Sequence, residues 1–387
     1  MIGGSVIVTV LAAMFALAPQ SAPPSVPATP APPPVPVTPA PPPVPVTPVA
    51  PARPTAPPAP LTLADLTVLY DEIPDRTIAR RAEALESQRY LLIYQGCDPQ
   101  AARTGVIDAD AVIREIARKT ATGSPRFGML DFEDPFTANL QLGASSPKCQ
   151  ATVATMVAAM RAVRARYPNI LWTYYGVPFV PYWLDGKNWL NATPAAKAAL
   201  LERLYQVYAP LIAEVDWVSP SIYPVYDPLL FEPKTPDLVR QHGRAWRAAT
   251  VGFAKILAAG KPVIPTVSPL WQPNGVATAG TTVPQVQFIE DQIEPAAAAG
   301  ASGVALWTGI NYGITLAIDG YEKNLPQDET FGTRVWRAAF VKEYLDNQPP
   351  RDWNDPLVRA TLVRKGSNTI LDAIRWIRLA KSTAAPP

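Results

Sequence analysis

Histidine and cysteine are nearly absent from this sequence. Among 387 residues there is one histidine, His242, and there are two cysteines, Cys97 and Cys149. A zinc or iron site that needs two imidazole ligands is therefore excluded, and a serine or cysteine nucleophile would depend on His242 alone. His242 lies among basic residues with no adjacent carboxylate to orient it, so we expect a solvated surface histidine. Carboxylates and tyrosines remain as the residues that carry chemistry.

The sequence also has little net charge and, after the first expected strand, no nucleotide-binding loop. The 34 Lys and Arg residues nearly balance the 32 Asp and Glu residues, whereas a nucleic-acid-binding protein usually has a concentrated basic face. No Gly-x-Gly-x-x-Gly or Walker-type loop follows the first expected strand, which disfavours a nucleotide-binding open sheet. We expect a monomer that binds no nucleic acid, uses no cofactor and holds no metal.

The N-terminal part consists of two segments of unusual composition. Residues 1–18 contain a short apolar stretch that is typical of a signal peptide or, if it is uncleaved, of a membrane anchor. Residues 19–60 hold 20 of the 47 prolines, with a nine-residue duplication at 31–39 and 40–48. This tract predicts a disordered polyproline II spacer, with an SH3-type ligand as the alternative. Together the two segments predict a secreted, periplasmic or cell-surface protein.

Apolar runs alternate with helical patterns from residue 61 onward. This alternation predicts a parallel α/β protein, and more specifically a distorted (β/α) TIM-type barrel of about seven strands over residues 61–348. A helical tail is expected over 349–387, either packed against the barrel or forming an appendage. The expected strands are 66–70, 90–94, 127–131, 170–174, 215–218, 262–266 and 303–307, and the expected helices are 109–119, 151–166, 195–213, 235–259, 283–299 and 355–380.

An acidic pair, Asp131 and Glu133, ends the third expected strand. Positions i and i+2 of a strand face the same way, and at the carboxyl end of a barrel strand they face the mouth, where barrel enzymes keep their active sites. When two carboxyl groups lie close together, the charge of one raises the pKa of the other, which then keeps a proton near neutral pH. Cleavage of a glycosidic bond requires such a proton for the leaving oxygen. Neighbours on one strand suit the substrate-assisted variant, in which the sugar's 2-acetamido oxygen attacks. The alternative is an acidic cluster that pairs with Arg126 or with a helix terminus.

Aromatic residues end three other expected strands. Aromatic rings offer flat apolar faces to the C–H surfaces of sugars, and tyrosine hydroxyls donate hydrogen bonds to acetamide or hydroxyl oxygens. The aromatic runs are Trp172–Tyr175, the segment ending at Tyr223, and the segment ending at Trp307. The candidate substrate-binding residues are Trp307, Tyr174, Tyr175, Trp271 and Asp134.

Together these motifs resemble the hyaluronidase family of glycoside hydrolases. The similarity covers about residues 66–345, nearly the whole globular part. It implies a distorted barrel and endo-acting hydrolysis next to N-acetylhexosamine, with retention through the acetamido group. The motifs are Asp-aromatic-Glu at 131–133, Trp-x-Tyr-Tyr-x-x-Pro at 172–178, Pro-Ser-Ile-Tyr at 220–223, Gly-Val-x-x-Trp-x-Gly at 303–309, and the first strand at 67–74.

The resemblance also implies roles for individual residues. Glu133 would be the general acid/base, Asp131 would orient the acetamide, Tyr223 would hydrogen-bond near the acetamido oxygen, and Trp307 would form a wall of the site. The family's tyrosine after the sixth strand has no counterpart here, and Trp271 is expected to fill some of its space. The substrate is then a polysaccharide that contains N-acetylhexosamine: hyaluronan, chondroitin or a microbial polymer.

Two questions stay open at this level. Cys97 follows the second expected strand and Cys149 follows the acidic loop, so export favours a bridge that pins the loop bearing Glu133, with two unrelated thiols as the alternative. Two other functions compete with the hyaluronidase-like one. A chitinase-like enzyme shares the substrate-assisted chemistry but usually has a longer acidic run. A non-catalytic carbohydrate-binding or wall-associated barrel would have lost turnover.

Overall fold

The computed structural model describes most of the chain beyond the proline-rich tract. The expected leader at 1–18 and the expected spacer at 19–60 lie outside the described residues. The described ranges are 66–121, 123–184, 189–223, 236–271, 281–319 and 331–383.

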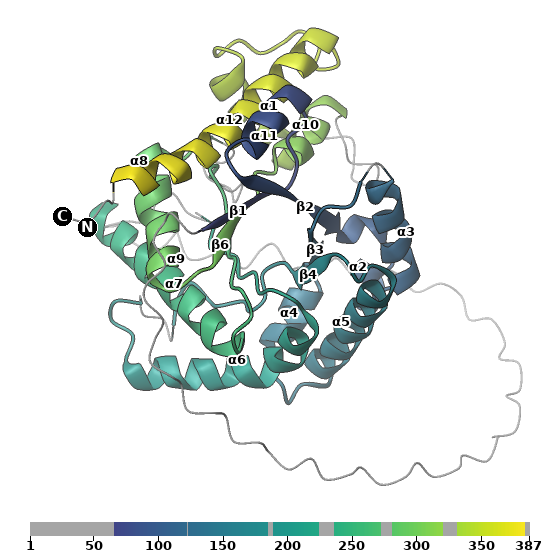
Figure 1. The fold of residues 1–387 in the computed structure, drawn as a ribbon, viewed down its shortest axis with the longest axis vertical. Coiled ribbons are helices and arrows are strands. Elements are labelled where there is room, and N and C mark those ends of the chain that lie inside the picture. Colours follow the sequence, from purple (N-terminus) through teal and green to yellow (C-terminus); the bar gives the residue numbers. More distant parts are fainter. Residues whose placement is uncertain are drawn as a thin grey trace, which may run out of the picture. The chain divides into compact units, whose positions relative to one another are not determined.

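A parallel six-stranded sheet lies at the centre, surrounded by helices (Figure 1). Its strand order is β4-β3-β2-β1-β6-β5, and each neighbouring pair is parallel. This is the expected α/β class with a TIM-like arrangement. The strands are β1 (Thr67–Tyr70), β2 (Ser87–Tyr94), β3 (Phe127–Asp131), β4 (Leu171–Tyr174), β5 (Thr266–Val267) and β6 (Gly303–Leu306).

The segment 216–222 lies between β4 and the chain leading into β5. On one side, the Asp216 amide donates a hydrogen bond to the Trp172 carbonyl at 2.8 Å. On the other side, the Ile264 amide donates to the Val218 carbonyl at 2.9 Å, and isolated parallel bridges continue on both sides. The fifth expected strand is therefore present as a bridged segment, and it closes the sheet into a distorted barrel.

The two faces of the barrel wall have separate cores, because successive strand residues face opposite sides. The outward-facing residues, such as Val68, Leu130 and Trp172, belong to a large core between the strands and the helices. A Cβ on Gly128 would collide with the Trp172 ring, so glycine is needed at this position. The inward-facing residues form a smaller core, made of Leu69, Tyr90, Leu92, Phe127, Met129, Trp217, Ile264 and Ala305.

The helices begin at residues that suit a helix start. Asp75 caps α1 by accepting hydrogen bonds from the amides of Thr77 and Ile78, and Thr193 caps α6 ahead of Pro194. In the described part of the chain, no helix is both long and apolar enough to cross a bilayer. The helical elements are α1 (Arg76–Glu83), η3 (Gln95–Cys97), α2 (Ala101–Thr104), α3 (Ala109–Thr120), α4 (Phe136–Gln141), α5 (Pro147–Arg166), α6 (Pro194–Glu214), α7 (Pro236–Leu257), α8 (Gln285–Phe288), η5 (Ile289–Ile293), α9 (Glu294–Ala298), α10 (Ile310–Asp319), α11 (Phe331–Tyr344) and α12 (Pro356–Thr383).

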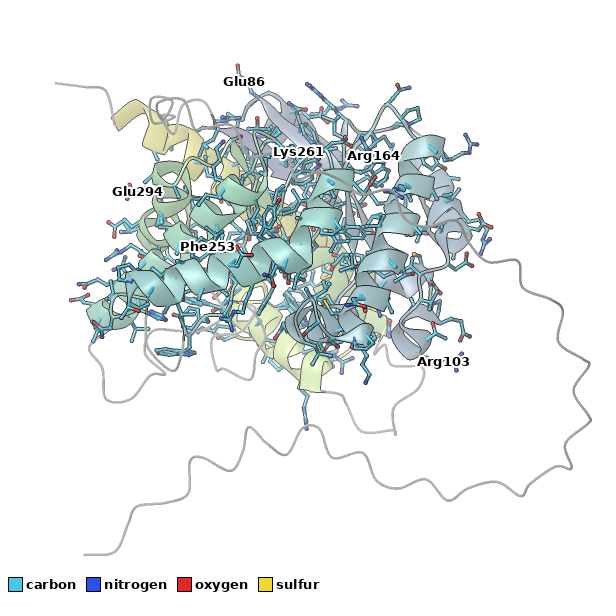
Figure 2. All side chains as sticks on the ribbon, turned by 90° about the horizontal axis from the view of Figure 1, so that it is seen from below. Glu86, Arg103, Arg164, Phe253, Lys261 and Glu294 are labelled. Atoms are coloured by element: carbon cyan, nitrogen blue, oxygen red, sulfur yellow. The ribbon has the colours of Figure 1, made fainter. Side chains whose placement is uncertain are left out.

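Ion pairs and caps gather near the starts of the strands. Lys261 donates to three backbone carbonyls at the end of α6, at 2.7 to 2.9 Å. Arg164 pairs with Asp216 at 2.7 Å. Figure 2 shows Arg164 and Lys261 on one side of the view and Arg103, which follows β2, on the opposite side. The polar contacts at the strand starts hold the fold together, and the opposite end is left for a binding site.

The C-terminal helix α12 packs against the barrel and is no appendage. It contacts α1, α10, α11 and η5. Arg378 donates hydrogen bonds to the carbonyls of Leu66, Leu85 and Glu86 and so ties α12 to the first strands. Its fully buried apolar residues are Leu362, Ile370, Leu371, Ala373, Ile374 and Ile377.

Candidate active site

A cleft of about 1090 Å³ opens at the carboxyl ends of the strands, the mouth of the barrel. Its volume is slightly above the range of about 300–1,000 Å³ for small-molecule sites and suits an oligosaccharide. Residues at or just beyond the ends of five strand segments meet here. They include Tyr94, Asp131, Glu133, Tyr175, Tyr223 and Trp307.

Asp131 faces the interior because it lies two residues beyond the inward-facing Met129 on β3. Its side chain is only 8% exposed, and its Oδ1 atom has no hydrogen-bond partner. Burial raises the pKa of Asp131 well above its usual value, and the nearby charge of Glu133 raises it further. A buried acceptor without a donor costs about 1–3 kcal/mol. An N–H group of a ligand would remove that cost.

Glu133 lies two residues beyond Asp131. It lines the cleft, and it is exposed. Partial removal of water by the surrounding protein raises the pKa of Glu133, and the charge of Asp134 adds to the effect. Asp134 also lines the cleft, and its carboxylate accepts a hydrogen bond from Thr137 at 2.8 Å. A carboxyl group with a raised pKa can keep a proton closer to neutral pH, as a general acid requires.

Gln95 holds the acidic loop through both ends of its side-chain amide. The Glu133 backbone amide donates to Gln95 Oε1 at 2.9 Å, and Gln95 Nε2 donates to the Asp134 carbonyl at 2.9 Å. Gln95 lies in η3, directly after β2, and lines the cleft. Sequence reasoning missed this residue, because a glutamine after a strand gives no signal of which backbone it contacts.

Three aromatic rings from different parts of the barrel wall stack beside the acidic pair. The ring centroids of Tyr175 and Tyr223 are 5.9 Å apart, and those of Tyr223 and Trp307 are 5.2 Å apart, with planes 28° and 19° from parallel. The Tyr175 hydroxyl donates to Ser221 Oγ at 3.1 Å. Burial raises the pKa of Tyr175 and of Tyr223 above their usual value. Both phenols therefore stay neutral and can donate hydrogen bonds.

Tyr94 is a second cleft residue that sequence reasoning missed. It ends β2 and faces inward because Leu92 does. Trp307 Nε1 donates to the Tyr94 hydroxyl at 2.9 Å. The hydroxyl oxygen thus serves as an acceptor for Trp307 and keeps its own proton to donate. Strand alternation from Leu92 is the signal that would have found it.

Tyr174 does not line the cleft, so the prediction that it binds substrate is wrong. It is 1% exposed, and its hydroxyl donates to the Met156 carbonyl of α5 at 2.7 Å. Neighbouring strand residues point to opposite faces. Tyr175 therefore faces the interior, and Tyr174 packs against the helices.

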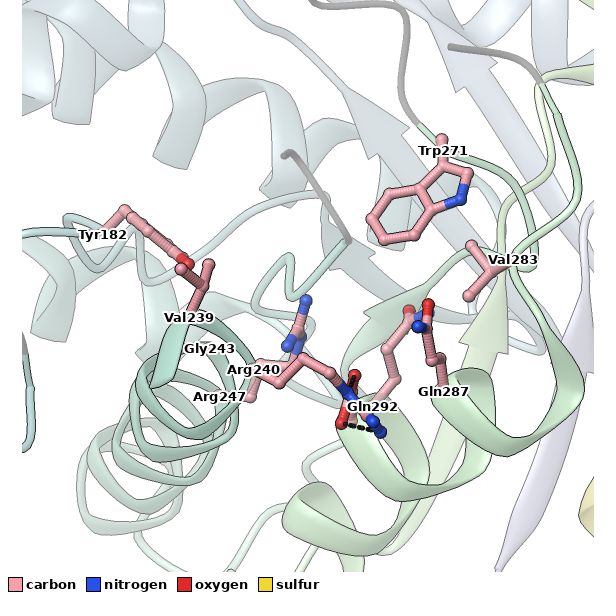
Figure 3. Close-up of a pocket in the computed structure, with 10 residues that line it drawn as sticks. Tyr182, Val239, Arg240, Gly243, Arg247, Trp271, Val283, Gln287 and Gln292 are labelled. Carbon is pink, nitrogen blue, oxygen red and sulfur yellow. Dashed lines mark hydrogen bonds and ion pairs between the residues drawn. The ribbon is translucent and has the colours of Figure 1, made fainter. Parts of the chain in front are cut away.

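Trp271 lines a second, smaller pocket instead of the cleft (Figure 3). This pocket lies between residues of α7 and of the segment around η5. In it, Arg240 pairs with Asp291 at 2.9 Å, and Arg247 donates to the Ile222 carbonyl at 3.0 Å. Trp271 therefore does not line the cleft, contrary to the prediction that it binds substrate there in place of the family's tyrosine.

The two cysteines form no bridge, contrary to the expectation from export. Both are free. Cys149 is buried in α5 with its thiol directed at the Leu140 carbonyl, 3.8 Å away. Cys97 lies in η3, and burial raises the pKa of its thiol to about 11. Both thiols are therefore poor nucleophiles at neutral pH.

His242 is buried, not solvated as expected. It is 3% exposed, its Nδ1 accepts a hydrogen bond from the Trp189 amide at 3.0 Å, and its ring stacks on Trp183 with centroids 4.7 Å apart. The helical spacing explains the difference. Val239, His242 and Trp246 lie on one face of α7, and all three are buried.

Asp71 is another carboxylate at the ends of the strands, and sequence reasoning missed it. It lies one residue beyond β1 and two beyond the inward-facing Leu69, so it faces the interior as Asp131 does. Burial raises the pKa of Asp71 to about 7, and its Oδ1 has no hydrogen-bond partner.

Over the described ranges, no group of three or more His, Cys, Asp or Glu side chains is placed to hold a metal ion.

No protein-family model matches the chain, and no curated protein sequence is significantly similar to it. Among solved structures, bee venom hyaluronidase gives a TM-score of 0.42 at 14% identity, covering 77% of this chain and 100% of that one. The same enzyme with a hyaluronic acid tetramer gives 0.42 at 12% identity, with 73% and 98% covered. A putative fructose-1,6-biphosphate aldolase from Coccidioides immitis gives 0.36 at 9% identity, with 81% and 90% covered. These are likenesses of fold only and assign no activity.

Proposed function

We propose that this protein is an endo-acting glycoside hydrolase that cleaves a polysaccharide next to N-acetylhexosamine. The observation that carries the proposal is a buried carboxyl group, Asp131, whose Oδ1 lacks a donor, two residues from the cleft-facing Glu133. The raised pKa of Glu133 and the stack of aromatic rings beside the pair support it. The resemblance of the motifs to hyaluronidases points to the same chemistry.

In the first step of the proposed reaction, the acetamido group of the substrate is the nucleophile. Asp131 accepts the amide N–H and so directs the acetamido oxygen toward the anomeric carbon. The bond from this oxygen to the anomeric carbon forms as the glycosidic bond breaks, and Glu133 gives its proton to the leaving oxygen. The product of this step is a cyclic oxazolinium ion, held beside a Glu133 carboxylate.

In the second step, water opens the oxazolinium ion. The Glu133 carboxylate takes a proton from water as the water oxygen bonds to the anomeric carbon, and the bond from the acetamido oxygen to that carbon breaks. The two inversions retain the configuration at the anomeric carbon, and both carboxyl groups return to their starting states. This chemistry needs only side chains of the chain itself, the substrate and water.

The aromatic rings have two roles in this proposal. The Tyr223 hydroxyl donates toward the acetamido oxygen, which a neutral phenol can do. Trp307, held by its hydrogen bond to Tyr94, presents a flat wall to the sugar. The composition of residues 1–60 supports a secreted or cell-surface protein, where such polymers are found.

The test measures new reducing ends. Purified full-length protein is incubated with hyaluronan, chondroitin and chitin oligosaccharides, beside Glu133→Gln and a control, Glu202→Gln, on the exposed side of α6. We expect cleavage of at least one polymer by the parent and the control, and a loss of about 10²–10⁴-fold in the Glu133 variant. Equal activity of the Glu133 variant, or no cleavage of any acetamido polymer, would contradict the proposal. Binding without cleavage would indicate a non-catalytic barrel.

A further inference from the structure

Three aromatic residues follow β4 closely and extend the wall of the cleft. We name Phe179, Tyr182 and Trp183 the aromatic shelf. Phe179 and Tyr182 line the cleft. Phe179 and Trp183 are each 38% exposed, a large fraction for side chains of this size. Apolar rings that gather beside a cleft mark a ligand-binding surface more often than single exposed rings do.

Buried tryptophans hold the backbone of the aromatic shelf. Trp246 Nε1 donates to the Val180 carbonyl at 3.2 Å, and Trp189 Nε1 donates to the Tyr182 carbonyl at 2.9 Å. Trp246 is 5% exposed and Trp189 is 1% exposed, so both donors are fixed by the core. A ligand that binds a preorganised surface loses less conformational entropy than one that must order a loop.

Ring contacts fix the side chains of the aromatic shelf as well. Trp183 stacks on the buried ring of His242, with planes 19° from parallel. Tyr182 meets Trp183 edge-on, with ring centroids 5.6 Å apart, and also meets His242 edge-on at 4.5 Å. The sole histidine of the chain thus serves as a support for an indole ring that stays more than one-third exposed.

We infer that the aromatic shelf is a distal sugar-binding subsite, separate from the acidic pair. Phe179 and Trp183 would stack on the C–H faces of sugar rings that lie beyond the one being cleaved. Two observations favour a saccharide occupant: the shelf continues the wall of a concave cleft, and that cleft is larger than one sugar ring requires. The choice of a saccharide rests on the proposed function.

The subsite is tested by binding rather than by turnover, in a Glu133→Gln background. Affinity is measured by calorimetry for di- and octasaccharides of hyaluronan and of chitin. Phe179→Ala and Trp183→Ala are expected to weaken octasaccharide binding about tenfold, which is about 1.4 kcal/mol, and to leave disaccharide binding unchanged. Trp183→Phe, which keeps a ring, should lose less.

The matched control is Tyr205→Ala, which removes an aromatic ring that is 57% exposed on α6 and does not line the cleft. Circular dichroism checks that each variant is folded.

Unchanged octasaccharide affinity in both shelf variants, or no binding of either oligosaccharide series by the Glu133→Gln protein, would overturn the subsite. If the wild-type protein binds octasaccharides through the shelf but cleaves nothing, the subsite stands and the proposed hydrolysis fails. If it cleaves polymers and the shelf variants keep their KM, only the subsite fails.

Discussion

Tyr174 on the outer face of the barrel wall and the carboxyl groups of Asp71 and Asp131 on its inner face differ in whether their buried polar atoms are paired. On the outer face, Tyr174 is buried and its hydroxyl bonds to the Met156 carbonyl. On the inner face near the mouth, Asp71 and Asp131 are also buried, yet each has an Oδ1 without a partner. Buried groups that stay unpaired cost stability and concentrate at functional sites. The outer face therefore supplies stability, and the inner face gives up some of it to form a binding site.

The largest expected effect is on the free energy of unfolding, when the buried carboxyl group of Asp71 on the inner face is removed. Its carboxyl group has a pKa of about 7 in the folded chain, against about 3.9 when unfolded. Between about pH 4 and 7 only the folded state holds this proton, so the group lowers the free energy of unfolding as pH rises, by up to about 4 kcal/mol. Asp71→Asn removes this dependence. Urea unfolding at about pH 4 and about pH 8 should show the variant gaining stability over the wild type at the higher pH.

The control for this prediction is Asp110→Asn, which changes an exposed carboxyl group on α3. This variant should follow the wild type at both pH values. Parallel stability curves for the wild type and Asp71→Asn would show that the inner carboxyl group carries no such cost.

The next effect concerns the contact between the acidic loop and Gln95. Gln95→Met keeps the size of the side chain and removes both hydrogen bonds to the loop. We expect kcat to fall about tenfold with KM nearly unchanged, because a loosely held Glu133 is less often in position to transfer its proton. Gln141→Met is the control, since Gln141 lines the same cleft on α4. An unchanged kcat in Gln95→Met would mean that the loop needs no such support.

A conservative variant sharpens this test. Gln95→Glu keeps the acceptor for the Glu133 amide and places a negative charge near the Glu133 carboxyl group. Like charges raise the pKa of a carboxyl group. The pH at which the proposed general acid loses its proton should therefore move upward in the activity profile, a change that simple loosening of the loop would not produce.

The smallest expected effects come from substitutions at two neighbouring residues, Tyr174 on the outer face of the barrel wall and Tyr175 on its inner face. Tyr174→Phe removes an outer hydrogen bond and should lower the free energy of unfolding by about 0.5–1.5 kcal/mol without changing kcat/KM. Tyr175→Phe removes a hydroxyl that lies at the cleft and should change kcat/KM a few-fold with a smaller effect on stability. The reverse pattern in unfolding and kinetic measurements would show that the two faces were assigned wrongly.

Much of the fold was predictable from sequence because apolar runs and helix starts repeat along the chain. Each predicted run contributes to the barrel, although the 215–218 run does so only through isolated bridges and backbone hydrogen bonds, and the 262–266 run overlaps β5 only at Thr266. The helix expected over 283–299 is instead α8, a π-helical turn and α9. Pro295 has no amide to donate to the turn before it, which helps to explain why the regular pattern breaks there.

The site was harder to predict because it depends on contacts between distant segments. Strand alternation places Asp131 in the interior, and the same rule applied to Leu69 and Leu92 would have found Asp71 and Tyr94. Applied to β4, the same rule would have predicted that Tyr175 lines the cleft and that Tyr174 does not. By contrast, no local pattern shows that Gln95 holds a loop about 40 residues away in sequence, or that Trp271 lines another pocket.

The central claim is that the substrate's own acetamido group takes part in cleavage. The most direct measurement compares initial cleavage rates of the best polymer and of the same polymer with its acetamido groups converted to free amines. The proposed mechanism predicts that wild-type protein cleaves the acetylated polymer and loses nearly all activity on the deacetylated one. Equal rates on the two polymers would contradict it, because the nucleophile would then have to come from elsewhere.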